Sequence, residues 1–339
     1  MAGATRRGFT LIELLIVLAI VGVVIAIILP VLGGARNTAK RAATLALLND
    51  LSNGSQQFVL DERRTPGYFN AFDMGAQSNS TRGFMAMENV LLDLSGGITT
   101  DAADDTKGIY AVGPKVQGTV NVNVNLIAAP ASNFSGTNTR AKGYFVPDKA
   151  NFVLQDTKAK KATNVDGHLK IPDLVDSFGT PILAWQQDDV PAGPTTPFAA
   201  IMSTKTLNGG GARFYWASNA GFLNAAPGKM GKNQKGTSSD PLAGKSMVGG
   251  GNPAANLIAS MTGILGHPSF PDPATSGNTL APGSARGGLI FHAAGTDGYF
   301  VGSTDKGGKV AMGRGGQIKY TSPDDAMIDF DDLMTAVGN

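Results

Sequence analysis

The hydrophobic residues of this chain are concentrated near its N-terminus. Residues 14–35 form 22 consecutive positions without a charged or strongly polar side chain. A helix of that length measures about 33 Å, which is enough to cross the roughly 30 Å hydrocarbon layer of a bilayer. The pattern predicts a membrane-spanning helix in preference to a buried helix of a soluble protein. Arg6 and Arg7 precede the run and favour a cytoplasmic N-terminus. Three cations follow the run and act against this orientation, namely Arg36, Lys40 and Arg41.

Beyond the apolar run the helix is expected to continue to about residue 60. Its apolar residues recur at three- and four-residue spacing between polar positions, which indicates an amphipathic helix. The stripe formed by Leu45, Leu48 and Leu51 is expected to hold a globular head. Pro30 and the Gly33-Gly34 pair weaken the helix between its two halves and predict a helix break. The sequence leaves open whether the helix unwinds there or only kinks.

Residues 61–339 have the pattern of a β-rich globular head with long loops. Residues 84–94 predict one short helix, and Val and Asn alternate over residues 119–127 as in a strand of a one-sided antiparallel sheet. Further strands are expected at residues 144–146, 182–185, 198–202, 212–217, 289–293 and 299–301. Loop insertions are expected near residues 224–252 and 266–288. The fold class is therefore α+β, with a long N-terminal helix before the head.

Composition narrows the functional classes. The chain has 28 basic and 26 acidic residues, and this net charge of +2 gives no general reason to expect nucleic-acid binding. The lysines near residues 158–161 and 229–245 fit solvated loops better than a nucleic-acid surface, because no aromatic residues are interleaved with them. Cysteine is absent from the sequence, which excludes disulfides, thiolate metal sites and cysteine nucleophiles.

One acidic residue lies inside the apolar segment. Glu13 has apolar neighbours on both sides, and an ionised carboxylate within a bilayer costs about 2.5 kcal/mol or more. Cleavage of the chain between Gly8 and Phe9 would create an α-amino group only four residues away. A cut at this point would therefore supply the positive charge that Glu13 needs.

The residues around Glu13 form a recognisable motif. Residues 6–14, with the sequence Arg-Arg-Gly-Phe-Thr-Leu-Ile-Glu-Leu, resemble the class III signal of type IV pilins and type II secretion pseudopilins. The resemblance covers residues 1 to about 60 and implies a leader at residues 1–8 and a transmembrane and stalk helix at residues 9–60. It implies that a prepilin peptidase cuts after Gly8 and methylates Phe9. It further implies that Glu13 pairs with the N-terminal amine of a neighbouring subunit, and it places Pro30 where members of the family carry a helix-breaking proline.

Two other export signals compete for the same residues. Residues 5–9 resemble a twin-arginine signal, and residues 33–35 offer the small side chains that signal peptidase accepts. Neither signal explains the carboxylate of Glu13. An apolar run of 22 residues also exceeds the roughly 7 to 15 residues of a signal-peptide core.

Short matches in the head extend the resemblance to major pseudopilins. Residues 176–181 resemble the Asp-Pro-Trp-Gly-x-Pro turn of these proteins, with Ser177 and Phe178 in place of Pro and Trp. Residues 294–298 resemble their Gly-x-Asp-Gly turn, and an acidic segment follows. The resemblance implies calcium as a ligand, with Asp297, Asp324 and Asp325 as the metal-binding residues. The alternative is that Asp324 and Asp325 cap a helix that begins at Ser322.

The sequence indicates a structural subunit rather than an enzyme. His168, His267 and His292 are widely separated and form no zinc-protease pattern, and no cofactor site is expected apart from calcium. The expected partners are copies of the chain through their N-terminal helices, prepilin peptidase, an inner-membrane assembly platform, and other pilins or pseudopilins. The expected location is the inner membrane, with a single span, a cytoplasmic N-terminus and an extracytoplasmic head, followed by the assembled filament. The alternatives are a minor tip subunit or adhesin-like recognition module, and an anchored hydrolase such as a glycosidase.

Overall fold

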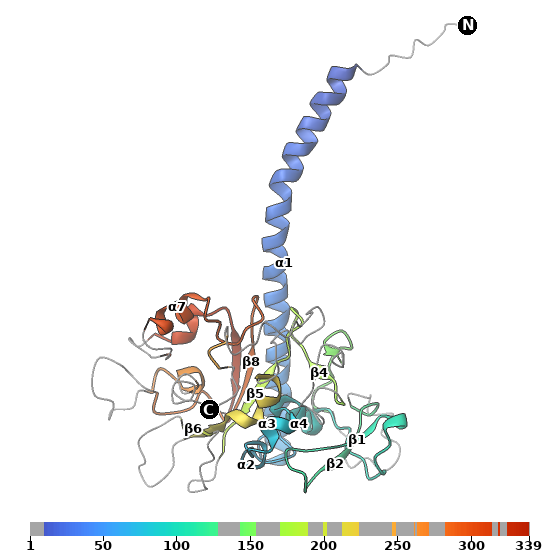
Figure 1. Ribbon diagram of the computed structural model, residues 1–339, viewed down its shortest axis with the longest axis vertical. Coiled ribbons are helices and arrows are strands. Elements are labelled where there is room, and N and C mark those ends of the chain that lie inside the picture. Colours follow the sequence, from blue (N-terminus) through green and yellow to red (C-terminus); the bar gives the residue numbers. More distant parts are fainter. Residues whose placement is uncertain are drawn as a thin grey trace. The chain divides into compact units, whose positions relative to one another are not determined.

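The computed structural model divides the chain into two compact units, Met1–Ala43 and Thr44–Asn339, which are described separately (Figure 1). It describes residues 10–127, 143–153, 170–188, 199–201, 212–223, 246–248, 261, 263–270, 282–313, 318 and 324–338, with the backbone alone at residues 30, 31 and 199–201.

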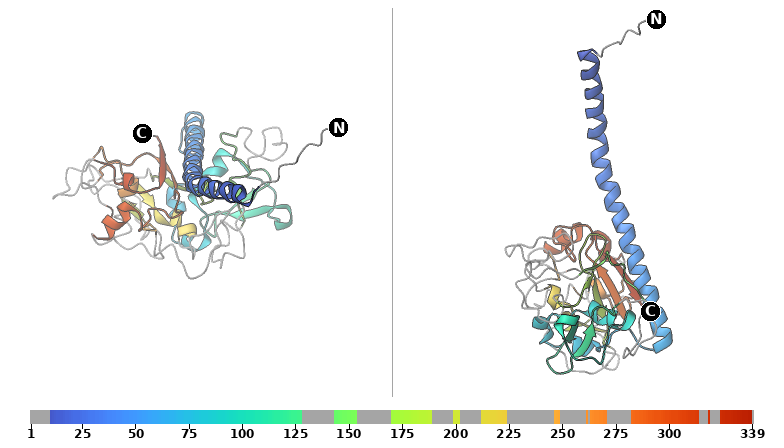
Figure 2. Two further views of the ribbon diagram at one scale, coloured as in Figure 1. Left: turned by 90° about the horizontal axis from the view of Figure 1, so that it is seen from above. Right: turned by 90° about the vertical axis from the view of Figure 1, so that its right-hand side faces the viewer.

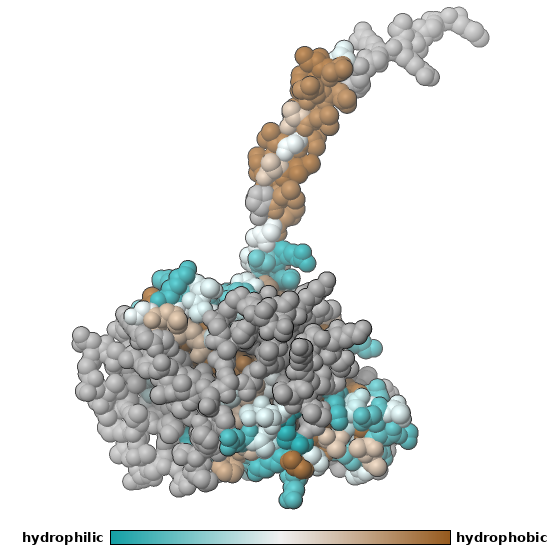
Figure 3. Space-filling model, in the orientation of Figure 1, coloured by the Kyte–Doolittle hydropathy of each residue, from teal (hydrophilic) through white to brown (hydrophobic). Residues whose placement is uncertain are grey.

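The described part of the first unit is helical. Helix α1 (Leu11–Glu62) begins in this unit and ends in the second, so the predicted long helix is confirmed from Leu11 onward. Its apolar side chains are exposed within the chain, as the brown band of Figure 3 shows; Leu18 is 62% and Ile27 64% exposed. Among the described helices, α1 is the one long and apolar enough to span a membrane. This is consistent with a membrane-anchored protein.

The described backbone shows no unwinding at Pro30, one of the two forms of helix break that the sequence leaves open. Helix α1 continues through Pro30 and through Gly33 and Gly34 without interruption. Proline removes one backbone hydrogen bond, whereas the turns on both sides of it retain theirs. An interior proline is therefore compatible with a continuous membrane-spanning helix.

The second unit is built on the second half of α1 and a three-stranded antiparallel sheet. Strands β5 (Leu183–Gln186), β8 (Leu289–Ala293) and β9 (Leu333–Val337) form this sheet in the order β5-β8-β9. Leu289 pairs with Gln186 on one side and with Val337 on the other. Figure 2 shows these strands beside the second half of α1.

All five residues of the central strand β8 are buried, and its two faces serve different cores. Leu289 and Phe291 point into a core shared with α1 and with helix α4 (Ala86–Leu94), to which α1 contributes Leu48, Leu51 and Phe58. Ile290 points into a second core, which contains both tryptophans of the chain, Trp185 and Trp216, together with Phe222 and Phe300. The central sheet is therefore covered on both faces, which explains why β8 is apolar apart from His292.

Short elements surround this sheet. The helical ones are α2 (Ala71–Met74), α3 (Asn79–Arg82), η1 (Asp105–Lys107), η3 (Trp216–Ser218), α5 (Ala220–Leu223), α7 (Lys306–Met312) and η5 (Ala326–Asp329). Antiparallel pairs are formed by β1 (Ile109–Val112) with β2 (Val120–Asn123), β3 (Phe152–Val153) with β4 (Asp173–Leu174), and β6 (Ala199–Ile201) with β7 (Arg213–Tyr215). The α+β fold class is confirmed.

Several predicted elements differ from the observed ones. Residues 144–146 and 299–301 are not strands, and the predicted C-terminal helix is wrong. The segment forms the short 3-10 helix η5 and then strand β9, because Leu333 and Val337 are buried against β8 and α1 in the first core. The two predicted loop insertions lie mostly outside the described residues.

Two leucines of α1 allow a matched test of how the helix holds the head. Leu51 is fully buried in the first core, whereas Leu60 is 78% exposed. We expect Leu51→Ala to lower the free energy of unfolding by about 2–5 kcal/mol, because it leaves a cavity. Leu60→Ala should change it by less than about 0.5 kcal/mol. Denaturant unfolding of the full chain in detergent measures both, and equal losses would contradict the observed packing of α1.

Candidate functional site

The N-terminal processing site is only partly described. Gly8 and Phe9 lie outside the described residues. At the start of α1, the Glu13 carboxylate accepts hydrogen bonds from the Thr10 backbone N–H at 2.8 Å and from Thr10 Oγ1 at 2.7 Å. The backbone N–H of Glu13 donates to Thr10 Oγ1 at 3.3 Å. Thr10 and Glu13 thus form a reciprocal capping box.

This capping box gives Glu13 a partner within its own chain. The signal was present in the sequence as Thr-x-x-Glu at residues 10–13, directly before the apolar run. Sequence analysis used the charge of Glu13 and missed its capping role. Glu13 therefore has two candidate roles, helix capping within the subunit and charge pairing between subunits.

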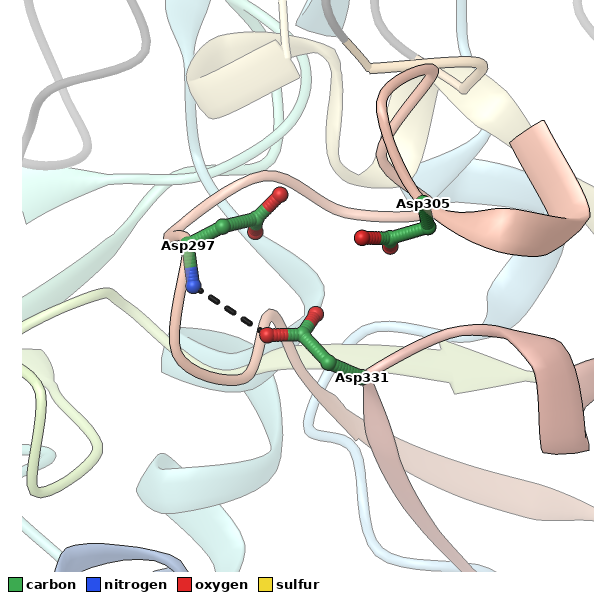
Figure 4. Close-up of side chains that lie close together, drawn as sticks. All are labelled: Asp297, Asp305 and Asp331. Atoms are coloured by element: carbon green, nitrogen blue, oxygen red, sulfur yellow. Dashed lines mark hydrogen bonds between the residues drawn. The ribbon is translucent and has the colours of Figure 1, made fainter. Parts of the chain in front are cut away.

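A group of carboxylates lies in the second unit, near the end of the central sheet. Asp297, Asp305 and Asp331 each offer one oxygen, and these oxygens lie within 4.8 Å of one another. Figure 4 shows the three side chains turned toward a common space. Asp297 lies in the turn after β8, Asp305 directly precedes α7, and Asp331 connects η5 with β9. We call these residues the aspartate cluster.

Local hydrogen bonds fix the turn that carries Asp297. The Asp331 carboxylate accepts the backbone N–H groups of Thr296 at 2.7 Å and Asp297 at 3.2 Å, and also the hydroxyl of Thr296. Gly295 has φ +70°, and a Cβ there would lie 2.4 Å from the backbone oxygen of Asp331. The glycine of the predicted Gly-x-Asp-Gly turn is therefore required both by its conformation and by the approach of Asp331.

Two carboxylates of the cluster, those of Asp297 and Asp305, have raised pKa values, with burial as the largest cause. Asp297 is exposed as a residue, but one of its carboxylate oxygens lies so close to Gly302 that a Cβ there would be 2.7 Å away. Partial burial, together with the charges of Asp331, Asp305 and Asp332, raises the pKa of Asp297 to about 7. Burial and the charges of Asp331 and Asp332 also raise the pKa of Asp305. The cluster is thus poorly suited to carry its negative charges without a cation.

A buried pair lies behind the cluster. His292 Nε2 is 2.6 Å from Asp332 Oδ1, and both side chains are fully buried. Asp332 also accepts the backbone N–H of Val301 at 2.9 Å; Val301 has φ 52°, which is rare for a β-branched residue. Burial raises the pKa of Asp332, and its hydrogen bond and charge interaction with His292 oppose this rise. Asp332 thus fixes the strained loop between Asp297 and Asp305.

The structure does not place Asp324 or Asp325 in this cluster. Asp325 forms two hydrogen bonds with Arg286, at 2.5 and 2.6 Å, and caps η5 by accepting the Met327 N–H. Burial opposes ionisation of Asp325, but the bonds and charge of Arg286 outweigh it and lower its pKa. Asp297 is therefore the one predicted metal residue in the cluster. The sequence also shows a second acidic pair in this segment, Asp331-Asp332, which was not predicted to bind metal. Asp305 stands alone in the sequence and has no neighbouring motif that indicates a metal site.

The donor set of the aspartate cluster fits a hard cation. Carboxylate oxygens are the ligands that Ca²⁺ prefers, and Ca²⁺ takes about six to eight of them. Asp297, Asp305 and Asp331 would supply part of such a set, and one oxygen of Asp305 is buried without a hydrogen-bond partner among the described residues. The residues present therefore fit the predicted ion class.

The predicted turn at residues 176–181 is held by hydrogen bonds within the turn and to α1. Asp176 Oδ1 accepts the N–H groups of Phe178 and Gly179, at 2.9 and 2.8 Å, and also that of Thr180 at 2.9 Å. The backbone N–H of Ser177 donates to Thr44 of α1 at 3.2 Å. This turn therefore connects the sheet to the helix.

The histidines give no catalytic arrangement among the described residues. His292 is buried in its pair with Asp332, and His267 stacks at a tilt on Phe270, with ring centroids 5.0 Å apart. His168 lies outside the described residues.

Comparison with known proteins gives two matches. A family model described as the prokaryotic N-terminal methylation motif matches residues 4–29. The chain is 30% identical over 112 residues to the type IV wide pilus major component PilA4 of Thermus thermophilus, and the alignment covers 31% of this chain and 86% of that relative. No solved structure matches the chain.

The raised pKa of Asp297 predicts a pH dependence of stability. Because this pKa is raised in the folded state, the stabilisation is present at about pH 4 and is lost as the pH rises to about 7. In the presence of a chelator, Tm of the parent chain in detergent should therefore fall between pH 4 and pH 7 relative to Tm of Asp297→Asn. Asp101→Asn, at an exposed and distant site, should retain the parent slope. An unchanged slope in Asp297→Asn would contradict the assignment.

Proposed function

The chain belongs to the type IV pilin and pseudopilin family, and from this premise we propose that it is cut after Gly8, methylated at Phe9 and polymerised through its N-terminal helix into a type II secretion pseudopilus or a type IV pilus-like filament. The observation that carries this proposal is the prepilin motif at residues 4–29, which leads directly into the exposed apolar half of α1. That half has to be covered by lipid before assembly and by other subunits after it.

The proposal includes the route of the protein. Prepilin peptidase would process it in the inner membrane, where it spans once with a cytoplasmic N-terminus and an extracytoplasmic head. An inner-membrane assembly platform would then add it to the filament, alongside other pilins or pseudopilins. Members of this family are generally structural proteins, and we propose a non-enzymatic role for the chain.

We propose a subunit of the filament body rather than of the tip. The relative from Thermus thermophilus is described as a major component of a type IV wide pilus, which supports this choice. A minor tip subunit or adhesin-like module is the alternative, since most of this 339-residue chain lies outside that alignment. Imaging of a tagged copy decides between them, because a body subunit labels the whole shaft and a tip subunit labels its end.

We further propose that the aspartate cluster binds calcium, with Asp297, Asp305 and Asp331 in place of the originally predicted ligand set. The three residues come from three separate segments of the head, so a bound cation would hold these segments together. The ion would also offset the burial and the repulsion that together raise the pKa of Asp297.

Calcium should therefore stabilise the folded head. A ligand present at about 100 times its Kd adds about 2.7 kcal/mol to the free energy of unfolding. We expect calcium to raise Tm of the full chain in detergent relative to chelator, and Asp305→Asn to reduce this rise strongly. Asp101→Asn should keep it in full. Identical melting of the parent chain in calcium and in chelator would refute the calcium proposal and leave the filament proposal standing.

Variants of Glu13 separate its two candidate roles. Glutamine keeps the capacity to form a capping box with Thr10 but removes the charge, whereas leucine removes both. If Glu13 pairs with the α-amino group of a neighbouring Phe9, both Glu13→Gln and Glu13→Leu should lower the yield of sheared filaments sharply, because charged hydrogen bonds are about twice as strong as neutral ones. If capping is its role, Glu13→Gln should assemble normally.

Membrane fractionation and the N-terminal mass, measured on the same cultures, serve as controls for this test. Both Glu13 variants should insert and be cut after Gly8, whereas Gly8→Val should accumulate as the uncut precursor. Normal filament yield from Glu13→Leu at normal expression would remove charge pairing from the mechanism. A mature start at Arg36 would instead indicate ordinary signal peptidase.

A further inference from the structure

The short helix α7 has an exposed side that is partly apolar and partly basic. Its buried residues are small, namely Gly308 and Ala311, and a Cβ at Gly308 would lie 2.1 Å from the backbone oxygen of Gly302. The exposed residues of the helix are two lysines and two large apolar residues: Lys306, Lys309, Val310 and Met312. The helix is therefore packed closely on the head through small residues, while its larger side chains remain accessible.

The neighbouring 3-10 helix η5 enlarges this exposed surface. Its Ile328 is 71% exposed. η5 packs against α7, since Lys306 Nζ donates to Asp329 Oδ1 at 2.5 Å and a Cβ at Gly307 would lie 2.4 Å from the ring of Phe330. Apolar side chains exposed together on packed elements mark sites of contact with proteins or membranes. We call the following set the α7 face: Lys306, Lys309, Val310, Met312 and Ile328.

The α7 face lies at the end of the head where α1 enters it. Ser177, in the turn before β5, donates its backbone N–H to Thr44 of α1 at 3.2 Å. β5 begins at Leu183, which pairs with His292 near the end of β8, and the chain continues from this end of β8 to α7. Figures 1 and 2 show α7 at this end of the head and the pair β1 and β2 at the opposite end.

This end of the head is also the end nearest to the apolar run along the chain. The run ends at Ala35, and the helical rise from there to Thr44 is about 14 Å. A headgroup layer takes up about 5–8 Å of this distance, and membrane helices are tilted by about 20° on average, which lowers one side of a head toward the lipid. A tilted α1 therefore brings elements at this end of the head to the lipid surface.

The chemistry of the α7 face suits such a surface. At a membrane interface, lysines keep their ammonium groups among the phosphates, while apolar side chains enter the boundary between headgroups and acyl chains. Lys306 pairs with Asp329, whereas Lys309 forms no ion pair with another described residue. The aspartate cluster, with Asp305 directly before α7, would repel anionic lipid. On our calcium proposal a bound ion offsets these charges, so calcium should favour the contact.

We propose that the α7 face rests on the lipid surface of the membrane before the subunit enters the filament, with Val310, Met312 and Ile328 at the boundary of the acyl chains and Lys309 among the phosphates. This inference rests on the proposed function, because it requires α1 to span the bilayer. The contact would hold the head of the free subunit in one orientation. Assembly would then have to release the α7 face from lipid.

Single-cysteine probes test this contact, because the natural chain has no cysteine. The full chain is placed at one copy per nanodisc of phosphatidylethanolamine and phosphatidylglycerol, in calcium, with the fluorophore NBD on the thiol and a nitroxide near the top of the lipid acyl chains. Met312→Cys should lose fluorescence to the nitroxide. Val116→Cys, on the connection between β1 and β2, should not. Leu32→Cys, near the end of the apolar run, reports insertion of α1 and should be quenched.

The outcomes separate the lipid contact from the proposed function. Quenching of Leu32→Cys with Met312→Cys as bright as Val116→Cys would overturn the contact and leave the proposed function standing. An unquenched Leu32→Cys would overturn both. Blue-shifted emission from Met312→Cys without quenching would also overturn the contact, because a protein surface rather than lipid would then cover α7.

Glutamine variants measure the basic part of the contact. With the probe at residue 312, Lys309→Gln should lower the ratio of docked to free heads about fivefold, which is the contribution of one lysine at an anionic lipid surface. Lys107→Gln removes a lysine whose side chain is 72% exposed in η1, next to β1, and should leave this ratio unchanged. Both variants should keep the parent Tm in detergent, because both side chains are exposed. Equal quenching in Lys309→Gln and the parent would overturn the position of Lys309 among the phosphates.

Discussion

The structure depends on one long helix whose first half cannot be covered by its own chain. Every large apolar side chain described between residues 11 and 32 is 46% or more exposed. Each such side chain gains about 1.5–3 kcal/mol when it leaves water, so the segment is stable only in lipid or against other proteins. The membrane location of the subunit and its capacity to polymerise are therefore consequences of the same uncovered surface.

The second half of the same helix holds the head. It buries one stripe in the head, where Leu48, Leu51 and Phe58 complete a core with α4 and the central sheet. The hydroxyl of Thr44 accepts the backbone N–H of Ser177, which adds a polar contact to the apolar ones. A head held in this way can be displayed by the helix that builds the filament.

Regular patterns in the sequence predicted the regular parts of the fold. The length and spacing of the apolar residues were sufficient for α1, and the local patterns at residues 84–94 and 289–293 located α4 and β8. The C-terminal segment was predicted wrongly, because Leu333 and Val337 also fit helical spacing and only the pairing of β9 with β8 decides between the two structures. The residues that meet in the aspartate cluster could be predicted only in part, for a related reason. The turn at Asp297 has a local signature, whereas Asp305 and Asp331 reach it through tertiary contacts that no local pattern encodes.

The arrangement around β8 and β9 explains how a chain without cysteine can restrain a loop at the end of its sheet. Asp331 and Asp332 are neighbours in sequence but act in different ways. Asp332 is buried, pairs with His292 and holds the strained backbone of Val301, whereas Asp331 receives the N–H groups of the turn that carries Asp297. Both restrain the segment between residues 295 and 305, yet they do so with carboxylates that repel Asp297 and Asp305. A cation at the cluster would relieve this repulsion while leaving the hydrogen bonds in place. The same acidic groups would then stabilise the loop more strongly with an ion than without one. On our calcium proposal, this loop of the head would therefore be held more firmly as the calcium concentration around the head rises.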